Sequence, residues 1–180
     1  MSNHFLKMIP GAILCDIPES ILDTLGNHFK KFTIYKPNIV NGDYKQWFVQ
    51  TASRSNIIKN EDNLFTEWLD NGILNEFKNY FLQYVDGIYR FRYSSMPATH
   101  KIDYHQPHKY PRIHIPLNDA KSFFNIDAEK TYEFVLERGK AYVLNVVYPH
   151  TVVADTFREH CFFSFKNFAN DDLKSKYWLS

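Results

Sequence analysis

The sequence predicts a mainly β protein with flanking helices, in which the second half of the chain forms an antiparallel sandwich or a small barrel. Two observations predict this class. Before Ile88 the apolar residues recur at helical spacing, whereas from Ile88 onward they alternate with the period of two that is typical of strands. In addition, turn residues and not helices separate the short predicted strands, which argues against a parallel sheet with helical crossovers.

Two helices are expected in the first half. The first begins near Asp16, a candidate N-cap, tolerates Pro18 in its first turn and ends near Phe32. The second runs from about Asp62 to Val85 and is interrupted at Asn71-Gly72. We expect these helices to pack outside the β core and to cover one of its sheets.

Five strands are expected in the second half, after an irregular strand around Gln46 to Val49. The five are Ile88 to Ser95, Arg112 to Leu117, Tyr132 to Glu137, Ala141 to Val147 and Cys161 to Phe165. Turn residues such as Asn118-Asp119 and Arg138-Gly139 separate consecutive strands.

Length and composition favour a single domain over residues 1–180, of which 44% are hydrophobic, because such a chain can bury one substantial core. Residues of about 1–87 form the helical part, and about 88–168 form the β core that carries the site. The formal net charge of +1 favours neither nucleic acid nor an anionic membrane surface as a partner.

The two cysteines, Cys15 and Cys161, are far apart and match no metal-binding or redox spacing. Isolated cysteines fit a reducing compartment. The apolar run from Met8 to Cys15 is interrupted by Pro10 and Gly11 and is too short for a signal peptide or a membrane span. We therefore expect a cytoplasmic protein.

Histidines and arginines gather in the strand-rich half, where six of the eight histidines lie between His100 and His160. Two Arg-x-His pairs are present, Arg112 with His114 and Arg158 with His160. Residues two apart on a strand share a face, so each pair faces one side while its apolar neighbours face the other. Arginines that converge inside a barrel require an anion, and a small dicarboxylate suits the fork of the guanidinium.

A metal centre beside this anion site is also predicted. His150 follows a Tyr-Pro corner, where its imidazole can face the mouth of the barrel. Partners for it are available in a segment that contains His100, Asp103, His105 and His108. Two imidazoles and one carboxylate on one face of an iron, with the other positions open, are the ligands of non-haem Fe(II) oxygenases.

Collinear motifs over about residues 88–167 resemble the aspartyl/asparaginyl β-hydroxylase family of the 2-oxoglutarate- and Fe(II)-dependent oxygenases. The motifs are Arg112 to Leu117, Gly139 to Asn145, His150, and Arg158 to His160. That family, which includes proline hydroxylases of the free amino acid, has a His-x-Asp, an Arg-x-His-x-Pro strand, a Gly-Glu-Ala strand, a distal His and a final Arg-x-His strand. The resemblance implies a double-stranded β-helix core of the jelly-roll or cupin type, with Fe(II) as cofactor and 2-oxoglutarate as co-substrate.

The resemblance also implies roles for single residues. His150 becomes the distal metal ligand, and Arg158 binds the far carboxylate of 2-oxoglutarate. Arg112 and His114 help to hold this co-substrate. Lys140 stands where the family has an acidic residue after the glycine, at a surface position where little consequence is expected.

The proximal metal motif departs from the family pattern and leaves three assignments open. His100 stands at the expected distance before Arg112, but Ile102 occupies the place of the aspartate and Asp103 follows one residue later. In the favoured assignment, His100 and Asp103 both bind the metal through a one-residue bulge. Alternatively, His100 and His150 bind it without a carboxylate, or Asp103 and His105 form the motif in reversed order. His108 is the least expected ligand.

The implied activity is the hydroxylation of an amino acid, free or within a peptide, coupled to the conversion of 2-oxoglutarate to succinate and carbon dioxide. Arg90 and Arg92 share a face of one strand and are candidates, with His105, to bind the substrate, although a solvated strand face has the same pattern. The alternative function is a non-catalytic, cupin-like module that binds a small anion or a metal.

Overall fold

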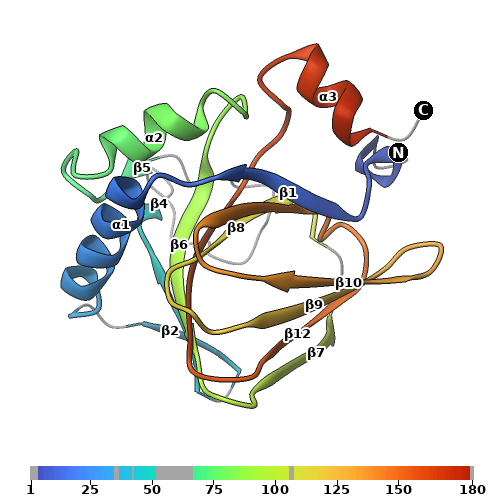
Figure 1. The fold of residues 1–180 in the computed structure, drawn as a ribbon. Coiled ribbons are helices and arrows are strands. Elements are labelled where there is room, and N and C mark those ends of the chain that lie inside the picture. The colour runs from blue at the N-terminus through green and yellow to red at the C-terminus, as the bar shows by residue number, and fades with distance from the viewer. Residues whose placement is uncertain (1–3, 35–36, 42, 52–66, 106–107, 179–180) are drawn as a thin grey trace.

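A computed structural model describes residues 4–34, 37–41, 43–51, 67–105 and 108–178 of the protein. Two antiparallel β-sheets lie face to face, and helices pack against the outer side of the larger sheet (Figure 1). The larger sheet has seven strands in the order β1-β11-β8-β13-β6-β3-β2, and the smaller sheet has four in the order β10-β9-β12-β7. A short pair, β4 (Gln50–Thr51) and β5 (Glu67–Trp68), stands apart from both.

The larger sheet consists of β1 (Gly11–Asp16), β2 (Asn38–Asn41), β3 (Tyr44–Phe48), β6 (Tyr89–Met96), β8 (Arg112–Pro116), β11 (Lys140–Leu144) and β13 (Arg158–Ser164). The smaller sheet consists of β7 (Lys101–His105), β9 (Ser122–Asp127), β10 (Thr131–Leu136) and β12 (His150–Ala154). From β6 to β13 the chain passes back and forth between the two sheets, which makes the core a double-stranded β-helix. The predicted fold class is therefore confirmed.

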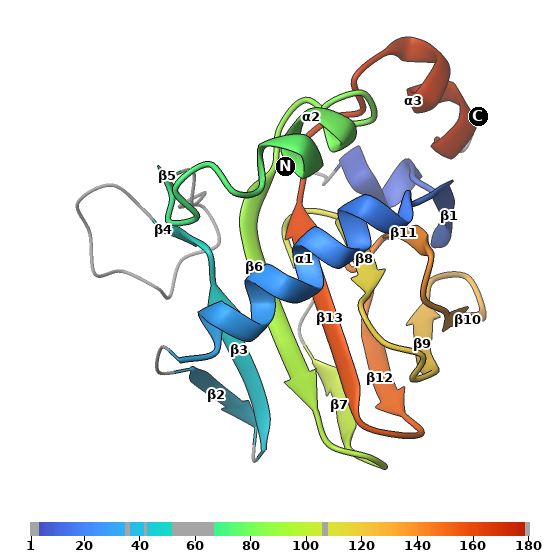
Figure 2. The ribbon, with the colours of Figure 1, turned by 60° about the vertical axis from the view of Figure 1, so that its left-hand side comes forward.

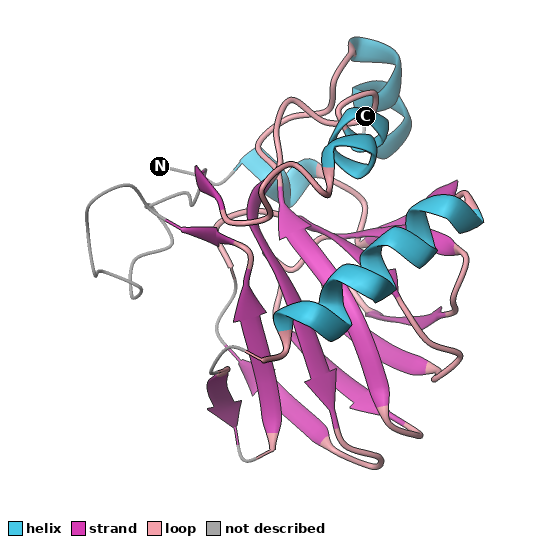
Figure 3. Ribbon diagram, turned by 90° about the vertical axis from the view of Figure 1, so that its left-hand side faces the viewer, coloured by secondary structure: helices cyan, strands magenta, loops and turns pink. Residues whose placement is uncertain are grey.

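Helix α1 (Glu19–Phe32) crosses the outer face of the larger sheet over β6, β13 and β8 (Figures 2 and 3). Its apolar side points to the sheet, and the ring of Phe29 stacks on Tyr93 of β6 with centroids 4.7 Å apart. The helix begins three residues after the predicted Asp16, because Asp16 is the last residue of β1 and Pro18 is the N-cap.

Helix α2 (Asn75–Phe81) is shorter than the predicted second helix. The positive φ angles of Asn71 (50°) and Gly72 (83°) end any helical path there, and Glu67–Trp68 is a strand. Residues 62–66 of the predicted helix lie outside the described residues. Helix α3 (Asp171–Tyr177), which we did not predict, begins at Asn170, whose side chain accepts a hydrogen bond from Leu173 N.

The first half of the chain is less helical than predicted. It adds β1 to one edge of the larger sheet and β3 and β2 to the other. The β1 segment begins directly after Pro10 and is a short edge strand, so its alternation is easily taken for an irregular apolar run. Within the described residues, no helix is long and apolar enough to cross a membrane.

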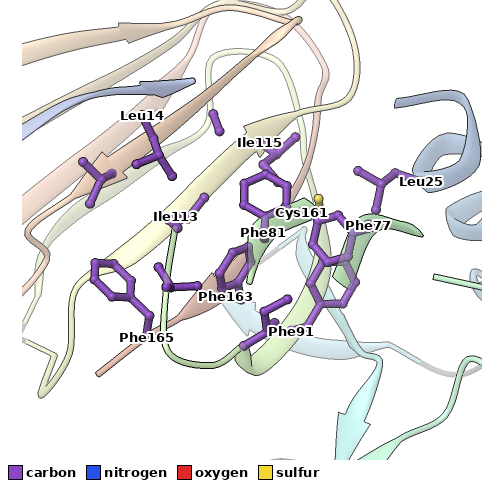
Figure 4. Close-up of a cluster of buried hydrophobic side chains, with 14 of the residues drawn as sticks. Leu14, Leu25, Phe77, Phe81, Phe91, Ile113, Ile115, Cys161, Phe163 and Phe165 are labelled. Carbon is purple, nitrogen blue, oxygen red and sulfur yellow. The ribbon is translucent and has the colours of Figure 1, made fainter. Parts of the chain in front are cut away.

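Two apolar clusters lie on opposite faces of the larger sheet. The outer cluster joins the sheet to α1 and α2, and its rings and aliphatic side chains interdigitate, as Phe77, Phe81, Phe91 and Phe163 do in Figure 4. The inner cluster lies between the two sheets and includes Met96, Phe124, Tyr142 and Leu144. Because strand side chains alternate, β3, β6 and β11 contribute to both clusters, whereas the apolar side chains of β8 and β13 in these clusters belong to the outer one.

Candidate metal and anion site

The two Arg-x-His pairs face the space between the sheets. Ile113 and Ile115 belong to the outer cluster, so Arg112 and His114 point inward, as the alternation predicts. The same holds for β13, where Cys161 and Phe163 belong to the outer cluster. The fold thus places polar, basic side chains on the inner face of a sheet whose outer face is apolar.

Arg158 and His160 form a hydrogen-bonded pair inside this space. Nη2 of Arg158 lies 2.9 Å from Nδ1 of His160, and Nε2 of His160 lies 3.3 Å from Oγ of Ser122 on β9. A guanidinium can only donate, so Nδ1 of His160 accepts and its proton resides on Nε2, from where it is donated to Ser122. The pair therefore links the two sheets and fixes the direction of the guanidinium.

Arg158 is a buried cation with neutral surroundings. Its exposed fraction is 1%, and burial lowers the pKa of its guanidinium to about 10. Its other contacts are Sδ of Met96 at 4.0 Å and the ring of Phe124, whose centroid lies 5.4 Å from Cζ. No carboxylate within the described residues pairs with it. An isolated buried cation is costly, so this environment suits an anion from outside the protein.

His114 occupies the middle of the interior. Its ring stacks on Phe162 with centroids 4.9 Å apart and planes 5° apart, and it meets Phe124 edge-on at 4.8 Å. Neither ring nitrogen has a hydrogen-bond partner in the part of the chain that the structure describes. Burial, and then the charges of Arg158 and Arg112, lower the pKa of His114 well below its usual value, so the ring is neutral.

Further guanidiniums line the other half of the same space. Cζ of Arg92 lies 4.4 Å from the ring centroid of Phe162 and 5.1 Å from that of Phe48. Cζ of Arg112 lies 5.5 Å from Phe162, so one ring is shared by two arginines. Desolvated contacts of this kind stabilise each cation.

A backbone irregularity re-aims Arg90. The register between β6 and β13 shifts between the Phe162 and Ser164 pairs, and Arg90 has a φ of 57°. A bulge of this kind turns side chains away from the regular alternation. It leaves Arg90 only 8% exposed, next to the ring of Phe48.

His150 stands at the end of the interior remote from Arg158. It pairs with Ile126 on β9, whereas Ser122, the partner of His160, pairs with Ala154 four residues further along β12. Nδ1 of His150 lies 2.9 Å from the carbonyl oxygen of Tyr148, so Nδ1 donates and the lone pair of the neutral ring is on Nε2. A metal-binding histidine typically has this arrangement, with its second nitrogen bonded to a backbone carbonyl.

Among the residues that the structure describes, His108 has its imidazole beside that of His150. The two ring centroids are 5.4 Å apart, with planes tilted by 46°. Because His108 lies outside the His-x-Asp spacing, it was the least expected ligand. Ser122, the partner of His160, was also missed, since nothing in the sequence indicates which strand faces β13 across the interior.

His100 is not brought to this position. Its carbonyl oxygen accepts a hydrogen bond from Ala154 N, at the far end of β12 from His150. Four residues of strand correspond to about 13 Å, so His100 and His150 do not face a common metal. The assignment of His100, Asp103 and His150 as ligands is therefore corrected, as is that of His100 and His150 alone. The reason is that β7 continues to His105, whose backbone stands opposite His150.

Asp103 and His105 belong to β7, but their side chains lie outside the described part of the structure. Their roles stay predictions. In the part of the protein that is described, no three histidine, cysteine or acidic side chains form a group able to hold a metal ion. His108 and His150 make a pair of such side chains.

The fold and this interior define the protein as a double-stranded β-helix with a basic, histidine-bearing core. No protein-family model and no curated protein matches the sequence. Among solved structures, an oxidoreductase of the 2OG-Fe(II) oxygenase family from Burkholderia pseudomallei is similar in fold, with 16% identity and a TM-score of 0.62. The match covers 92% of this chain and 89% of that one.

A prolyl-4-hydroxylase from Pseudomonas putida is also similar, with 10% identity, a TM-score of 0.56 and coverage of 91% of this chain and 95% of that chain. Both likenesses extend over nearly the whole of this chain. At such identities they establish the shared double-stranded β-helix fold.

Proposed function

We propose that this protein is a 2-oxoglutarate- and Fe(II)-dependent dioxygenase that hydroxylates an amino acid, free or within a peptide. The observation that carries the proposal is the buried guanidinium of Arg158, which contacts only neutral groups within the described residues. A carboxylate of 2-oxoglutarate would offset the cost of burying that charge through charge-assisted hydrogen bonds. The fold, shared with two oxygenase structures, supports the proposal.

The residues at the other end of the interior fit a ferrous ion. His150 directs its lone pair from Nε2, and a second imidazole, that of His108, lies beside it. Imidazole is a suitable ligand for iron. A ferrous ion held there would supply dioxygen activation and the oxidative decarboxylation of 2-oxoglutarate to succinate.

The protein's own residues bind and orient the reactants. Arg158, with its direction fixed by His160, binds the far carboxylate of the co-substrate. His114 lies between that guanidinium and the His150 end and offers a ring nitrogen to the co-substrate. The rings of Phe124 and Phe162 exclude water from the same space, which strengthens each of these interactions. Arg112 helps to hold the co-substrate, and Arg90 and Arg92 are the candidates for a carboxylate of the substrate.

A non-catalytic anion-binding module is the second candidate. The observation that favours it is again the buried guanidinium of Arg158, which requires an anion whether or not a metal is bound. Such a module would bind 2-oxoglutarate through Arg158 with an affinity that is independent of metal.

Anaerobic titration of the metal-free protein with Fe(II) and 2-oxoglutarate tests the proposal. We expect a weak visible charge-transfer band of the iron chelate, and slow succinate formation when air is admitted. If neither the band nor succinate appears while 2-oxoglutarate still binds, the enzyme proposal is rejected and the anion-binding module is supported. A panel of free amino acids and short peptides, scored by the stimulation of succinate formation, would then identify the substrate.

A further inference from the structure

We propose that His108 is an imidazole ligand of the same metal ion as His150. The inference rests on the proposed function, because it concerns the same ferrous centre. The spacing of the His-x-Asp motif does not assign this role to His108, which stands four residues before Arg112.

The first argument is the separation of the two rings. Metal–nitrogen bonds of about 2.1 Å at tetrahedral or octahedral angles place the centroids of two ligand imidazoles roughly 5 Å apart. The centroids of His108 and His150 are 5.4 Å apart. Their planes are tilted by 46°, unlike the parallel stack of His114 on Phe162, so the contact is not a stacking arrangement.

The second argument is that one turn of the chain holds both residues. The amide of His108 donates to the carbonyl oxygen of Val146 at 2.9 Å, and the ring of His150 donates to the carbonyl oxygen of Tyr148. Val146 is fully buried, and Tyr148 N is bonded in turn to Asn145 O. The turn of residues 145–148 therefore holds the backbone of His108 and the ring of His150, and such preorganisation is what a metal site requires.

The position of the pair agrees with the chemistry of the interior. His150 lies at the end remote from Arg158, so a metal between His108 and His150 would leave the length of the interior for an anion. The pair supplies two ligands of the metal.

Metal binding by matched variants tests the inference. His108→Phe keeps a ring against His150 but removes the nitrogen donors, and His100→Phe is the control on the same segment. Cu(II) bound to each protein is examined by pulsed EPR, which counts coordinated imidazoles, and Co(II) affinity is measured from its visible absorption. We expect one imidazole fewer and an affinity lower by on the order of 10- to 100-fold for His108→Phe. The control should match the wild type in both respects.

The outcomes separate the two proposals. If the wild-type protein binds neither metal, the proposed function fails together with the inference. If it binds metal and His108→Phe retains both the imidazole count and the affinity, the inference alone is overturned. Should His108→Phe fold poorly, His108→Gln serves as the replacement, because a partly exposed position accepts this polar side chain, and the same loss of one imidazole is expected.

Discussion

Nη2 of Arg158 donates a hydrogen bond to Nδ1 of His160 across 2.9 Å in a fully enclosed part of the protein. The geometry fixes a single tautomer of His160, since a guanidinium has no lone pair to offer in return. The guanidinium of Arg158 is thus held in place by a neutral partner and has no counter-ion among its contacts. Its orientation is therefore preorganised for the binding of an anion.

Replacing Arg158 by methionine should separate binding from stability. We expect affinity for 2-oxoglutarate to fall about 100-fold, because two charge-assisted hydrogen bonds are lost. The ligand-free protein should be more stable by about 1–2 kcal/mol, because a buried cation is replaced by an apolar chain. Calorimetry and urea unfolding measure the two effects. In the control Arg138→Met, a surface ion pair with Glu19 is lost and the affinity stays unchanged; undiminished binding by Arg158→Met would refute the assignment.

Stability should depend on pH through the buried histidines. Burial, and then the nearby charge of Arg158, lower the pKa of His114 and of His160 well below the usual 6.5, so both are neutral when folded. Below about pH 6.5 the unfolded chain binds these protons and the folded protein does not. With respect to these two histidines, the free energy of unfolding is therefore at its maximum above this pH. Below it, the free energy falls by about 1.4 kcal/mol per pH unit per histidine.

His114→Phe tests this dependence, since it should remove the contribution of one histidine to the slope between about pH 6.5 and 5. Urea unfolding at several pH values provides the measurement. Phe124→Leu, which alters the neighbouring ring, should lower stability equally at each pH. An unaltered slope in His114→Phe would mean that the ring is protonated in the folded state.

Asn145 should be a strong determinant of stability. Its side-chain amide donates to the carbonyl oxygens of Phe5 (2.8 Å) and Met8 (3.1 Å), and it is fully buried. Asn145→Leu leaves these two acceptors unsatisfied, so we expect a loss of about 2–4 kcal/mol in the free energy of unfolding. Chemical denaturation measures it. Asn125→Leu removes one long, half-buried hydrogen bond to Thr151 and should change stability by less than about 1 kcal/mol.

The positive φ of Arg90 predicts an unusual order of two substitutions. A residue with a side chain costs about 1–2 kcal/mol in this left-handed conformation, whereas glycine adopts it freely. Arg90→Gly should therefore be more stable than Arg90→Ala by about 1 kcal/mol, although glycine is the poorer strand former elsewhere. At the regular position Arg92 the order should be reversed. Thermal and urea unfolding of the four variants decide the matter, and equal stability of the two Arg90 variants would indicate no strain.

The fold could be predicted where periodicity is strong. In β8 and β13, polar and apolar residues alternate clearly in the sequence. The structure confirms that Arg112, His114, Arg158 and His160 face the interior and that their apolar neighbours face the helices. β12 was not predicted, because four of its five residues are buried and its sequence therefore lacks a polar–apolar alternation. β9 was not predicted either, because each of its faces carries both polar and apolar residues. The edge strand β1 was missed because it is short and directly follows Pro10.

The orientation of the arginines was predictable from the sequence, whereas the histidine that lies beside His150 was not. On a strand, the two side chains of an Arg-x-His pair must point to the same face. In contrast, the segment with His100, Asp103, His105 and His108 offers several possible pairs of metal ligands. Which of them meets His150 depends on the register between β7 and β12, and the irregularity between the His150 and Val152 pairs decides that register. Sequence spacing alone does not reveal such an irregularity, so His100 was placed at the site and His108 was not.

The alternation of β8 and β13 has a consequence for how this chain can change over evolutionary time. A single inserted or deleted residue within either strand would move Phe163 to the interior and expose Arg158 to the helices, and both compartments would fail together. Length variation among related chains should therefore be confined to turns and to existing irregularities such as the one at Arg90. A point substitution can alter the chemistry of the interior alone, whereas a change in the number of residues in either strand would disrupt both faces of the larger sheet.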